Sequence, residues 1–282
     1  MDNPLLINPE LEKKRIVKFL KTTFYQQKID KAVIGLSGGV DSAVSLYLLK
    51  EVLKPENIFV NHLYYYQPQI ELIEKLLQKT KIPKENVLFI QIKQIVKKIK
   101  ELKFDRWHER EGSRQRAAEH LCEANPDGKE TRDRICQIRL GNIIARTRMI
   151  ILFDLAKKNN ALVCGTENKS EHLLGYFTRF GDAASDLEPI THLYKTQVYQ
   201  LAEYLKVPKD IIEQKPTAGL WVGQTDEAEF GFTYKEADQV LYLYFDKKFT
   251  VEKIIQQGFK NAEKIIERMK KNKFKLKTPY FI

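Results

Sequence analysis

Short apolar runs alternate along the chain with longer amphipathic segments. The apolar runs have the length of buried strands and occur at residues 31–36, 57–65, 86–92 and 161–166. The segments around them carry apolar residues at helical spacing, as Ile16, Leu20 and Phe24 show in the first one. Strands that alternate with helices at short spacing predict a doubly wound α/β fold, in which helices cover both faces of a mostly parallel sheet.

The helices predicted on this basis cover residues 8–28, 42–53, 68–80, 93–102, 135–158 and 194–205, with further helices up to about residue 271. A polar loop is expected to follow the last strand, and residues 216–231, with glycine and tryptophan, should form another loop. Residues 105–134 are dense in charge and contain the turn signal Asn-Pro-Asp-Gly, so we expect an excursion there. Because the chain shows no internal repeat, we expect a single domain, 1–282.

Positive charge is concentrated in two parts of the chain. The net charge is +11, and residues 247–282 hold 11 Lys and Arg against 3 acidic residues, which predicts a basic helical tail. An arginine-rich stretch extends from Arg106 to Arg148. Such patches suit nucleic acid or polyphosphate-bearing small molecules, although a solvated helix face is the favoured interpretation of the tail. Since no run is apolar enough to span a bilayer and no secretion signal is visible, we expect a cytoplasmic protein that does not act at a membrane.

The three cysteines do not suggest a structural framework. Cys122, Cys136 and Cys164 are widely spaced, which argues against a set of disulfides. His120 could join Cys122 and Cys136 in a zinc site, but such a site would need a fourth ligand at suitable spacing. Ordinary reduced cysteines are the favoured interpretation.

The stretch from Gly35 to Ser42 carries the clearest chemical signal. It lies between a predicted strand and a predicted helix, where unpaired backbone N–H groups and the positive end of the helix dipole favour anions. Gly38 and Gly39 let the backbone approach phosphate oxygens, and the serine hydroxyls add donors. Asp41 would repel phosphate unless a divalent cation lay between them, which predicts a magnesium ligand. A tight turn with a helix-capping aspartate is the less favoured alternative.

This loop matches neither the P-loop nor the dinucleotide-binding pattern, and it has no lysine for a γ-phosphate. Its Ser-Gly-Gly-Val-Asp-Ser run resembles the pyrophosphate-binding loop of the N-type ATP pyrophosphatases, which have an adenine nucleotide alpha hydrolase-like fold. That superfamily cleaves ATP between the α- and β-phosphates and includes GMP synthetase, asparagine synthetase, tRNA-modifying enzymes and NAD synthetase. The resemblance implies that ATP contacts Gly35, Leu36, Ser37, Gly38, Gly39, Val40, Asp41 and Ser42.

The second half of the chain narrows the resemblance to NAD synthetase. Residues 164–208, which begin Cys-Gly-Thr-Glu-Asn-Lys-Ser-Glu, are similar to this family. So are residues 215–238, which begin Lys-Pro-Thr-Ala-Gly, and the Ala-Arg-Thr-Arg-Met run at 145–149. The resemblance implies a ligase that forms a C–N bond in two steps. ATP adenylates the nicotinate carboxylate of deamido-NAD with release of pyrophosphate, and ammonia then attacks the acyl adenylate to give NAD and AMP.

The same resemblance assigns roles around ATP. It implies that Glu171 shares a magnesium ion with Asp41, and a solvated helix position is the alternative for Glu171. Thr166, at the carboxyl end of a predicted strand, and Thr217 are implied to contact ATP. Lys195 is implied to contact the phosphates, where a cation would stabilise the charge that builds on the departing pyrophosphate. Mg²⁺ is thus the expected cofactor, and ATP is a co-substrate.

Roles around the second substrate are implied in the same way. The residues implied to contact deamido-NAD are Arg146, Arg179, Asp186 and Lys275. Asp182 is implied to hold ammonium and to assist its deprotonation. This sequence departs from the family pattern where Ala183 and Ala184 replace two glycines after Asp182, where Arg179 replaces a lysine, and where Phe274 replaces a histidine.

The resemblance also bears on the nitrogen source and on assembly. Glutamine-dependent relatives carry a nitrilase-like domain before the synthetase region, whereas only residues 1–34 precede this loop, so we expect free ammonia as the donor, with a separate glutaminase left open. Family members are homodimers, and a homodimer is expected here. A tRNA-modifying ATP pyrophosphatase and a non-catalytic nucleotide- or RNA-binding protein remain as alternatives. Nucleic acid is not the favoured partner, because neither an RNA-binding appendage nor a sulfur-handling cysteine pair is evident.

Overall fold

The computed structural model describes residues 4–102, 129–221, 223–277 and 279 of the chain. Within these ranges four parallel strands form one sheet in the order β3-β2-β1-β4, where the strands are β1 (Ala32–Gly35), β2 (Ile58–Tyr64), β3 (Val87–Gln91) and β4 (Leu162–Cys164). Ala32 of β1 is in register with Ile58 of β2 and with Leu162 of β4. Every strand lies inside a predicted apolar run, and the prediction of a parallel α/β fold is confirmed.

Most helices also occupy the predicted segments. Their bounds are α1 Pro9–Gln27, α2 Val40–Lys50, α3 Ile70–Gln78, α4 Lys93–Lys100, α5 Lys129–Asn159, α7 Lys195–Tyr204, α10 Tyr234–Leu241, α11 Val251–Gln256 and α12 Ala262–Asn272. A further short helix, α8 (Lys209–Ile212), lies between the helix predicted at 194–205 and the loop predicted at 216–231, where no helix was predicted. The two segments predicted as loops each contain a short helix, α6 (Lys169–Leu174) and α9 (Asp226–Phe230). α5 begins inside the predicted excursion at 105–134, most of which lies outside the described residues, as do His120 and Cys122.

Short segments of other helix types also occur among the described residues. Three 3₁₀ helices there cover Pro55–Asn57, Lys84–Asn86 and Lys273–Leu276, and a π-helical segment, Tyr242–Asp246, continues α10. No helix within the described ranges is both long and apolar enough to cross a membrane.

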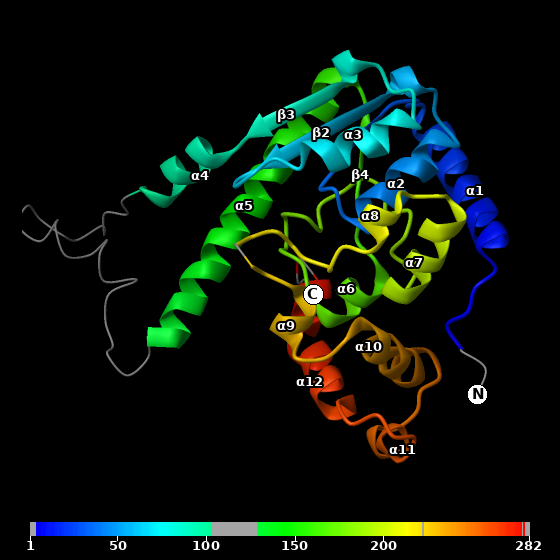
Figure 1. The fold of residues 1–282 in the computed structure, drawn as a ribbon, viewed down its shortest axis with the longest axis vertical. Coiled ribbons are helices and arrows are strands. Elements are labelled where there is room, and N and C mark those ends of the chain that lie inside the picture. Colours follow the sequence, from blue (N-terminus) through cyan, green and yellow to red (C-terminus); the bar gives the residue numbers. More distant parts are fainter. Residues whose placement is uncertain (1–3, 103–128, 222, 278, 280–282) are drawn as a thin grey trace, which may run out of the picture.

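The sheet separates two apolar layers because successive side chains of a strand point to opposite faces. Ala32 and Ile34 of β1 pack in a layer with α1, α2, α3 and α7, whereas Val33 between them packs with Ala156 of α5 on the other face. Figure 1 shows α5 running along one side of the sheet, with α2 and α3 on the opposite side. A strand that is buried on both faces needs an uninterrupted apolar run, which explains the pattern in the sequence.

A second apolar core lies apart from the sheet, in the lobe that α6 and α9–α12 form at the bottom of Figure 1. We call this unit the C-terminal lobe. Leu174 of α6, Leu241 of α10 and Ile265 of α12 are each fully buried in it. The carboxyl ends of the strands face this lobe, so the space between the two cores is the natural place for a ligand site.

Candidate active site

The loop between β1 and α2 leaves backbone N–H groups open. Gly38 has a φ of +91°, in the left-handed region that favours glycine. Ser42 Oγ donates to the Gly39 carbonyl at 2.9 Å and accepts from the Ser37 N–H at 3.3 Å, so the loop is closed by its own hydroxyl. Gly39 is the N-cap of α2, and no described side chain caps this helix end. The first turn of α2 therefore presents N–H groups and the positive end of the helix dipole to an anion.

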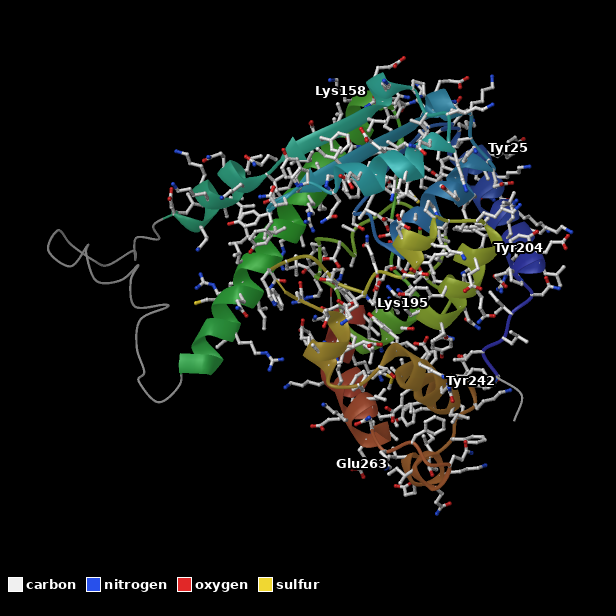
Figure 2. All side chains as sticks on the ribbon, viewed as in Figure 1. Tyr25, Lys158, Lys195, Tyr204, Tyr242 and Glu263 are labelled. Carbon is white, nitrogen blue, oxygen red and sulfur yellow. The ribbon has the colours of Figure 1, made fainter. Side chains whose placement is uncertain are left out.

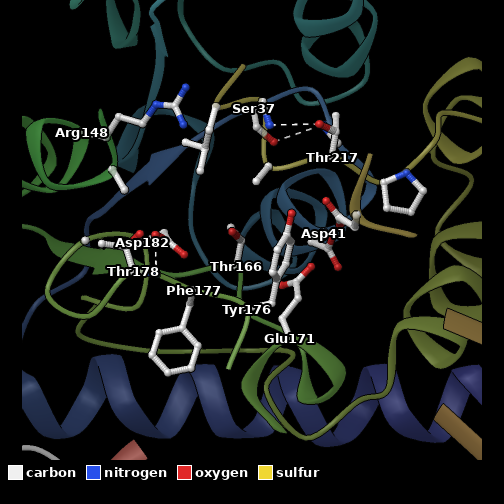
Figure 3. Close-up of a pocket in the computed structure, with 18 of the residues that line it drawn as sticks. Ser37, Asp41, Arg148, Thr166, Glu171, Tyr176, Phe177, Thr178, Asp182 and Thr217 are labelled. Carbon is white, nitrogen blue, oxygen red and sulfur yellow. Dashed lines mark hydrogen bonds between the residues drawn. The ribbon is translucent and has the colours of Figure 1, made fainter. Parts of the chain in front are cut away.

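A cavity of about 1060 Å³ opens beside this loop, between the carboxyl edge of the sheet and the C-terminal lobe. Figure 3 shows part of its lining. The residues predicted for ATP, metal and ammonia that line it are Gly35, Leu36, Ser37, Gly39, Val40, Asp41, Ser42, Thr166, Glu171, Asp182, Lys195 and Thr217. The fold thus brings side chains from both halves of the chain to one cavity. Gly38 is not part of the lining, and its role is to shape the loop.

Asp41, Glu171 and Lys195 meet in this cavity. Lys195 Nζ lies 2.5 Å from Asp41 Oδ2 and 3.2 Å from Glu171 Oε1. The lysine side chain is only 3% exposed, whereas the two carboxylates keep 16% and 18% of their surface open to the cavity. Figure 2 shows Lys195 near the centre of the molecule, and Figure 3 shows Asp41 and Glu171 directed toward each other.

Asn168 joins the same two carboxylates through their other oxygens. Its Nδ2 donates to Asp41 Oδ1 at 2.9 Å, and its backbone N–H donates to Glu171 Oε2 at 3.4 Å. Asn168 is also the N-cap of α6, because its Oδ1 accepts the backbone N–H of Glu171 at 3.0 Å. Each carboxylate therefore shares one oxygen with Lys195 and the other with Asn168.

The backbone of Lys195 is held by a buried network at the start of α7. Its N–H donates to Ser170 Oγ at 2.8 Å, and the Ser170 hydroxyl donates to Asp238 Oδ1 at 2.5 Å. Asp238 Oδ2 accepts the N–H of Thr196 at 2.8 Å, so a carboxylate from α10 lies at the positive end of α7. Burial raises the pKa of Asp238 to about 6 against the effect of these hydrogen bonds. The network connects the lysine to the C-terminal lobe.

The charges in the cavity favour a further cation once both carboxylates are ionised. Burial by itself would lower the pKa of Lys195, but the attraction of Asp41 and Glu171 is larger and raises it, so the ammonium group stays charged. Burial raises the pKa of Glu171 to about 8, while Lys195 opposes this shift and Asp41 adds to it. Two carboxylates beside one ammonium attract additional positive charge when both are ionised.

Asp41 and Glu171 could together hold a magnesium ion. Their oxygens converge on one point, which Lys195 Nζ marks at 2.5 and 3.2 Å, and carboxylate oxygens are the protein ligands that Mg²⁺ prefers. Among the described residues, no group of three or more His, Cys, Asp or Glu side chains could form a metal site. A pair of carboxylates needs phosphate or water oxygens to complete an octahedron, which suits a metal that binds together with a nucleotide.

Asp182 and Arg148 line the cavity on the side away from Asp41 in Figure 3. Asp182 Oδ1 accepts the N–H of Thr178 at 3.0 Å. The side chain is exposed to the open cavity, but the protein atoms that surround it in the cavity wall reduce its hydration and raise its pKa. Arg148 Nε donates to the Leu63 carbonyl at 3.1 Å, and no described carboxylate forms an ion pair with it. The half-buried guanidinium of Arg148 faces the cavity without a carboxylate partner among the described residues, so it is suited to an anionic group of a ligand.

Comparisons with known proteins agree with this site. The family model described as NAD synthase matches residues 12–279. The NH(3)-dependent NAD(+) synthetase of Fusobacterium nucleatum is 39% identical, over 98% of this chain and 97% of its own. The chain belongs to the NAD synthase family. The predicted resemblance is confirmed, and with it the enzyme class, a ligase that forms C–N bonds.

Another relative and two solved structures are also similar to this chain over nearly its full length. The NH(3)-dependent NAD(+) synthetase of Trichlorobacter lovleyi is 37% identical, over 98% of this chain and 91% of its own. NMN synthetase from Francisella tularensis has a TM-score of 0.73 at 29% identity, covering 98% of this chain and 99% of that one. The NH3-dependent NAD synthetase of Campylobacter jejuni has a TM-score of 0.70 at 27% identity, covering 98% and 100%.

Three residues implied to contact the dinucleotide do not line the cavity. Arg146 is exposed, and its Nε donates to the Arg179 carbonyl at 3.3 Å. The guanidinium of Arg179 lies over the ring of Phe274, 5.2 Å from its centre. Asp186 Oδ2 accepts the N–H of Val163 at 2.7 Å and so supports β4. Arg146 and Arg179 thus form a basic pair outside the cavity.

The basic tail contributes one wall of the cavity. Lys264, Arg268 and Lys271 of α12 line it, together with Lys275 in the following turn. Lys275 Nζ donates to the carbonyls of Gly175 and Phe177 at 2.7 and 3.0 Å. The interpretation of the tail as a solvated helix face is therefore incomplete, because one face of α12 is turned toward the ligand space.

Three residues of the site were not predicted from the sequence, Asn168, Arg148 and His62. His62 is buried, its Nδ1 lies 2.8 Å from the Leu36 carbonyl, and its Nε2 accepts the N–H of Gln69 at 3.0 Å. Burial lowers the pKa of His62, which keeps the ring neutral with a donor on one side and an acceptor on the other. The ring thereby joins the loop between β1 and α2 to the start of α3, a contact for which the sequence offers no signal.

Proposed function

We propose that this chain is an ammonia-dependent NAD⁺ synthetase, which uses ATP to amidate deamido-NAD and releases AMP and pyrophosphate. The observation that carries the proposal is the convergence of Asp41, Glu171 and Lys195 beside the open N-terminus of α2. Two carboxylates and a buried cation beside an anion-binding loop suit phosphate-transfer chemistry better than binding alone. Relatives named NH(3)-dependent NAD(+) synthetase, at 37% and 39% identity over 98% of the chain, support the same activity.

In the first step the cavity holds ATP while a substrate carboxylate attacks the α-phosphorus. The open N–H groups of the first turn of α2 bind phosphate oxygens, and Thr166 and Thr217 line the same space. Lys195 places a positive charge against the departing pyrophosphate, and burial makes this attraction stronger than it would be in water. Asp41 and Glu171 would hold Mg²⁺, which when bound draws charge away from phosphate oxygens.

In the second step ammonia attacks the adenylated carboxylate and AMP leaves. Asp182 lies in the cavity wall, and a carboxylate whose pKa is raised is a better acceptor for a proton from ammonium. The free guanidinium of Arg148 suits an anionic group of the nucleotide substrate. Tyr176 and Phe177 also line the cavity and present aromatic surface to a nicotinate ring.

We also propose a homodimer in the cytoplasm that uses free ammonia. Arg146 and Arg179 lie outside the cavity, and α5 carries the exposed apolar side chains Ile135, Ile138 and Ile150. An interface on this face would place the basic pair near the cavity of a second subunit, where a dinucleotide could contact it. Sedimentation of the purified chain tests the assembly, and a monomer that makes NAD at full rate would contradict it.

One assay tests the activity. Purified protein is incubated with ATP, Mg²⁺, ammonium and deamido-NAD, and NAD and AMP are followed together. We expect equal amounts of both, and we expect Asp41→Ala to abolish them. Nicotinate mononucleotide is offered in a parallel reaction, because one solved neighbour is an NMN synthetase. Preference for the mononucleotide would overturn the substrate assignment, and AMP that forms only when tRNA is added would overturn the reaction class.

A further inference from the structure

Asn168 is fully buried, and each of its polar groups other than the backbone carbonyl contacts one of the two proposed metal ligands or the backbone that carries it. We propose that Asn168 is a positioning residue, which orients Asp41 and Glu171 for the binding of a divalent metal with a nucleotide. The inference deepens the proposed function, since it depends on these two carboxylates holding the metal.

In each carboxylate, Asn168 contacts one oxygen and leaves the other available to bind a cation. The amide donates to Asp41 Oδ1, which restrains rotation of that carboxylate and leaves Oδ2 directed at Lys195 Nζ. The backbone N–H does the same for Glu171, whose Oε2 it contacts while Oε1 is directed at Lys195. Because the donors of Asn168 are neutral, they orient both side chains without neutralising their charge, so the pair keeps its attraction for a cation.

Lys195 alone cannot keep this arrangement during the reaction. Its ammonium marks the point where the ligand oxygens converge, so a metal at that point requires the lysine to move toward the phosphates. The contacts from Asn168 are on the opposite oxygens and are compatible with either cation. Hydrogen-bond partners of metal ligands commonly change metal affinity by about 10- to 100-fold when they are removed.

The simplest alternative role for Asn168 is that of a helix cap. Asn8 provides a matched control, because it caps α1 in the same way and lies in an exposed part of the chain. Its Oδ1 accepts the N–H groups of Glu10 and Leu11, both at 3.1 Å. Serine and threonine cap helices nearly as well as asparagine, but neither can donate from the position of the Asn168 amide.

The test compares Asn168→Ser with Asn8→Ser. Affinity for Mn²⁺ with α,β-methylene-ATP, an analogue that cannot be cleaved between the α- and β-phosphates, is measured by calorimetry and by the EPR signal of bound Mn²⁺. Urea unfolding is recorded for each variant. We expect Asn168→Ser to weaken binding of Mn²⁺ with the analogue by at least tenfold and Asn8→Ser to leave it unchanged, with similar shifts in urea midpoint. Asn168→Thr fills more of the buried volume than Asn168→Ser does, so its affinity for Mn²⁺ with the analogue is measured instead if the serine variant does not fold.

A double variant identifies the path of the effect. In an Asp41→Ala background, Asn168→Ser should cause at most a twofold further loss, because the amide then has no carboxylate to orient. Binding of Mn²⁺ with the analogue at wild-type affinity by Asn168→Ser and Asn168→Thr would overturn the proposal, as would an equal loss in the Asn8 variant or an undiminished loss in the Asp41→Ala background. These measurements need no turnover, so a failure of the NAD assay and a failure of this inference can be told apart.

Discussion

Replacement of Glu188 by glutamine should remove a loss of stability that the wild-type protein undergoes as the pH rises toward 8. Glu188 lies against the end of β4, where an ideal Cβ on Gly165 would be only 1.7 Å from its Oε1. Oε1 accepts from the Ser185 hydroxyl at 2.7 Å, and Oε2 accepts from the Glu167 N–H at 3.0 Å. Burial raises the pKa of Glu188 to about 8, the hydrogen bond from Ser185 opposes the shift, and repulsion from Glu167 adds to it.

The raised pKa sets the sign and the size of the effect. A rise from the ordinary value of 4.5 to about 8 disfavours ionised Glu188 in the folded protein by about 5 kcal/mol, since one pKa unit corresponds to about 1.4 kcal/mol. The unfolded chain releases this proton near pH 4.5, whereas the folded chain keeps it until about pH 8. The contribution to stability is therefore complete below pH 4.5, falls by about 1.4 kcal/mol per pH unit and is lost above about pH 8.

Urea unfolding at pH 6, 7 and 8 measures this contribution. Glu188→Gln keeps the size of the side chain and cannot ionise, so its free energy of unfolding should fall by about 2 kcal/mol less than that of the wild type over this range. Glu203→Gln, at an exposed position of α7, is the matched control and should follow the wild type. Parallel curves for Glu188→Gln and the wild type would show that the folded protein does not retain this proton, and the reasoning would be refuted.

Two further substitutions test the packing and the charge of the site. Gly165→Ala should lower the free energy of unfolding by about 3 kcal/mol in urea, because its Cβ would overlap Glu188. Gly39→Ala, whose Cβ has Ser37 Oγ at 3.4 Å as its nearest neighbour, should cost less than about 1 kcal/mol, and equal costs would contradict the packing argument. Arg148→Met should change the free energy of unfolding by less than about 1 kcal/mol, since the guanidinium is only half-buried and the hydrogen bond to the Leu63 carbonyl is lost with it. The same variant should raise the KM for deamido-NAD at least tenfold in the NAD assay, and an unchanged KM would exclude a role for Arg148 in binding substrate.

The sequence predicts the strands and long helices well because each buries one face over several turns or residues and so leaves a periodic apolar pattern. The short helices were missed because they are too short to leave such a pattern, as the six residues of α6 show. A signal for α6 was nevertheless present in the spacing of Asn168 and Glu171, which is that of a capping box. α9 has only five residues and lies in a segment rich in loop-forming residues, so the sequence contained a weaker signal for this helix.

The resemblance pointed to residues most of which the fold brings to one cavity, but their mutual geometry could not be predicted. Arg146 and Arg148 illustrate the limit, because positions two apart on a helix point to nearly opposite sides. The resemblance points to Arg146, whereas Arg148 is the one that lines the cavity. Which side of α5 faces the cavity depends on how the helix packs, as Ile144 in the core shows, and this information lies in tertiary contacts rather than in the local pattern.

The candidate active site lies where two separate apolar cores meet. This arrangement explains why its polar groups form hydrogen bonds and ion pairs between the sheet layer and the C-terminal lobe. Asp41 begins α2, which packs on the sheet, whereas Glu171 belongs to α6, whose Leu174 is buried in the C-terminal lobe. Lys195 lies at the junction itself, since Tyr194 before it packs in the lobe and Val198 after it packs against the sheet layer. The distance between the two carboxylates therefore depends on the placement of the lobe against the sheet. Because apolar packing specifies distances less sharply than hydrogen bonds do, we expect the buried contacts of Asn168 and Lys195 to fix the spacing between the two carboxylates.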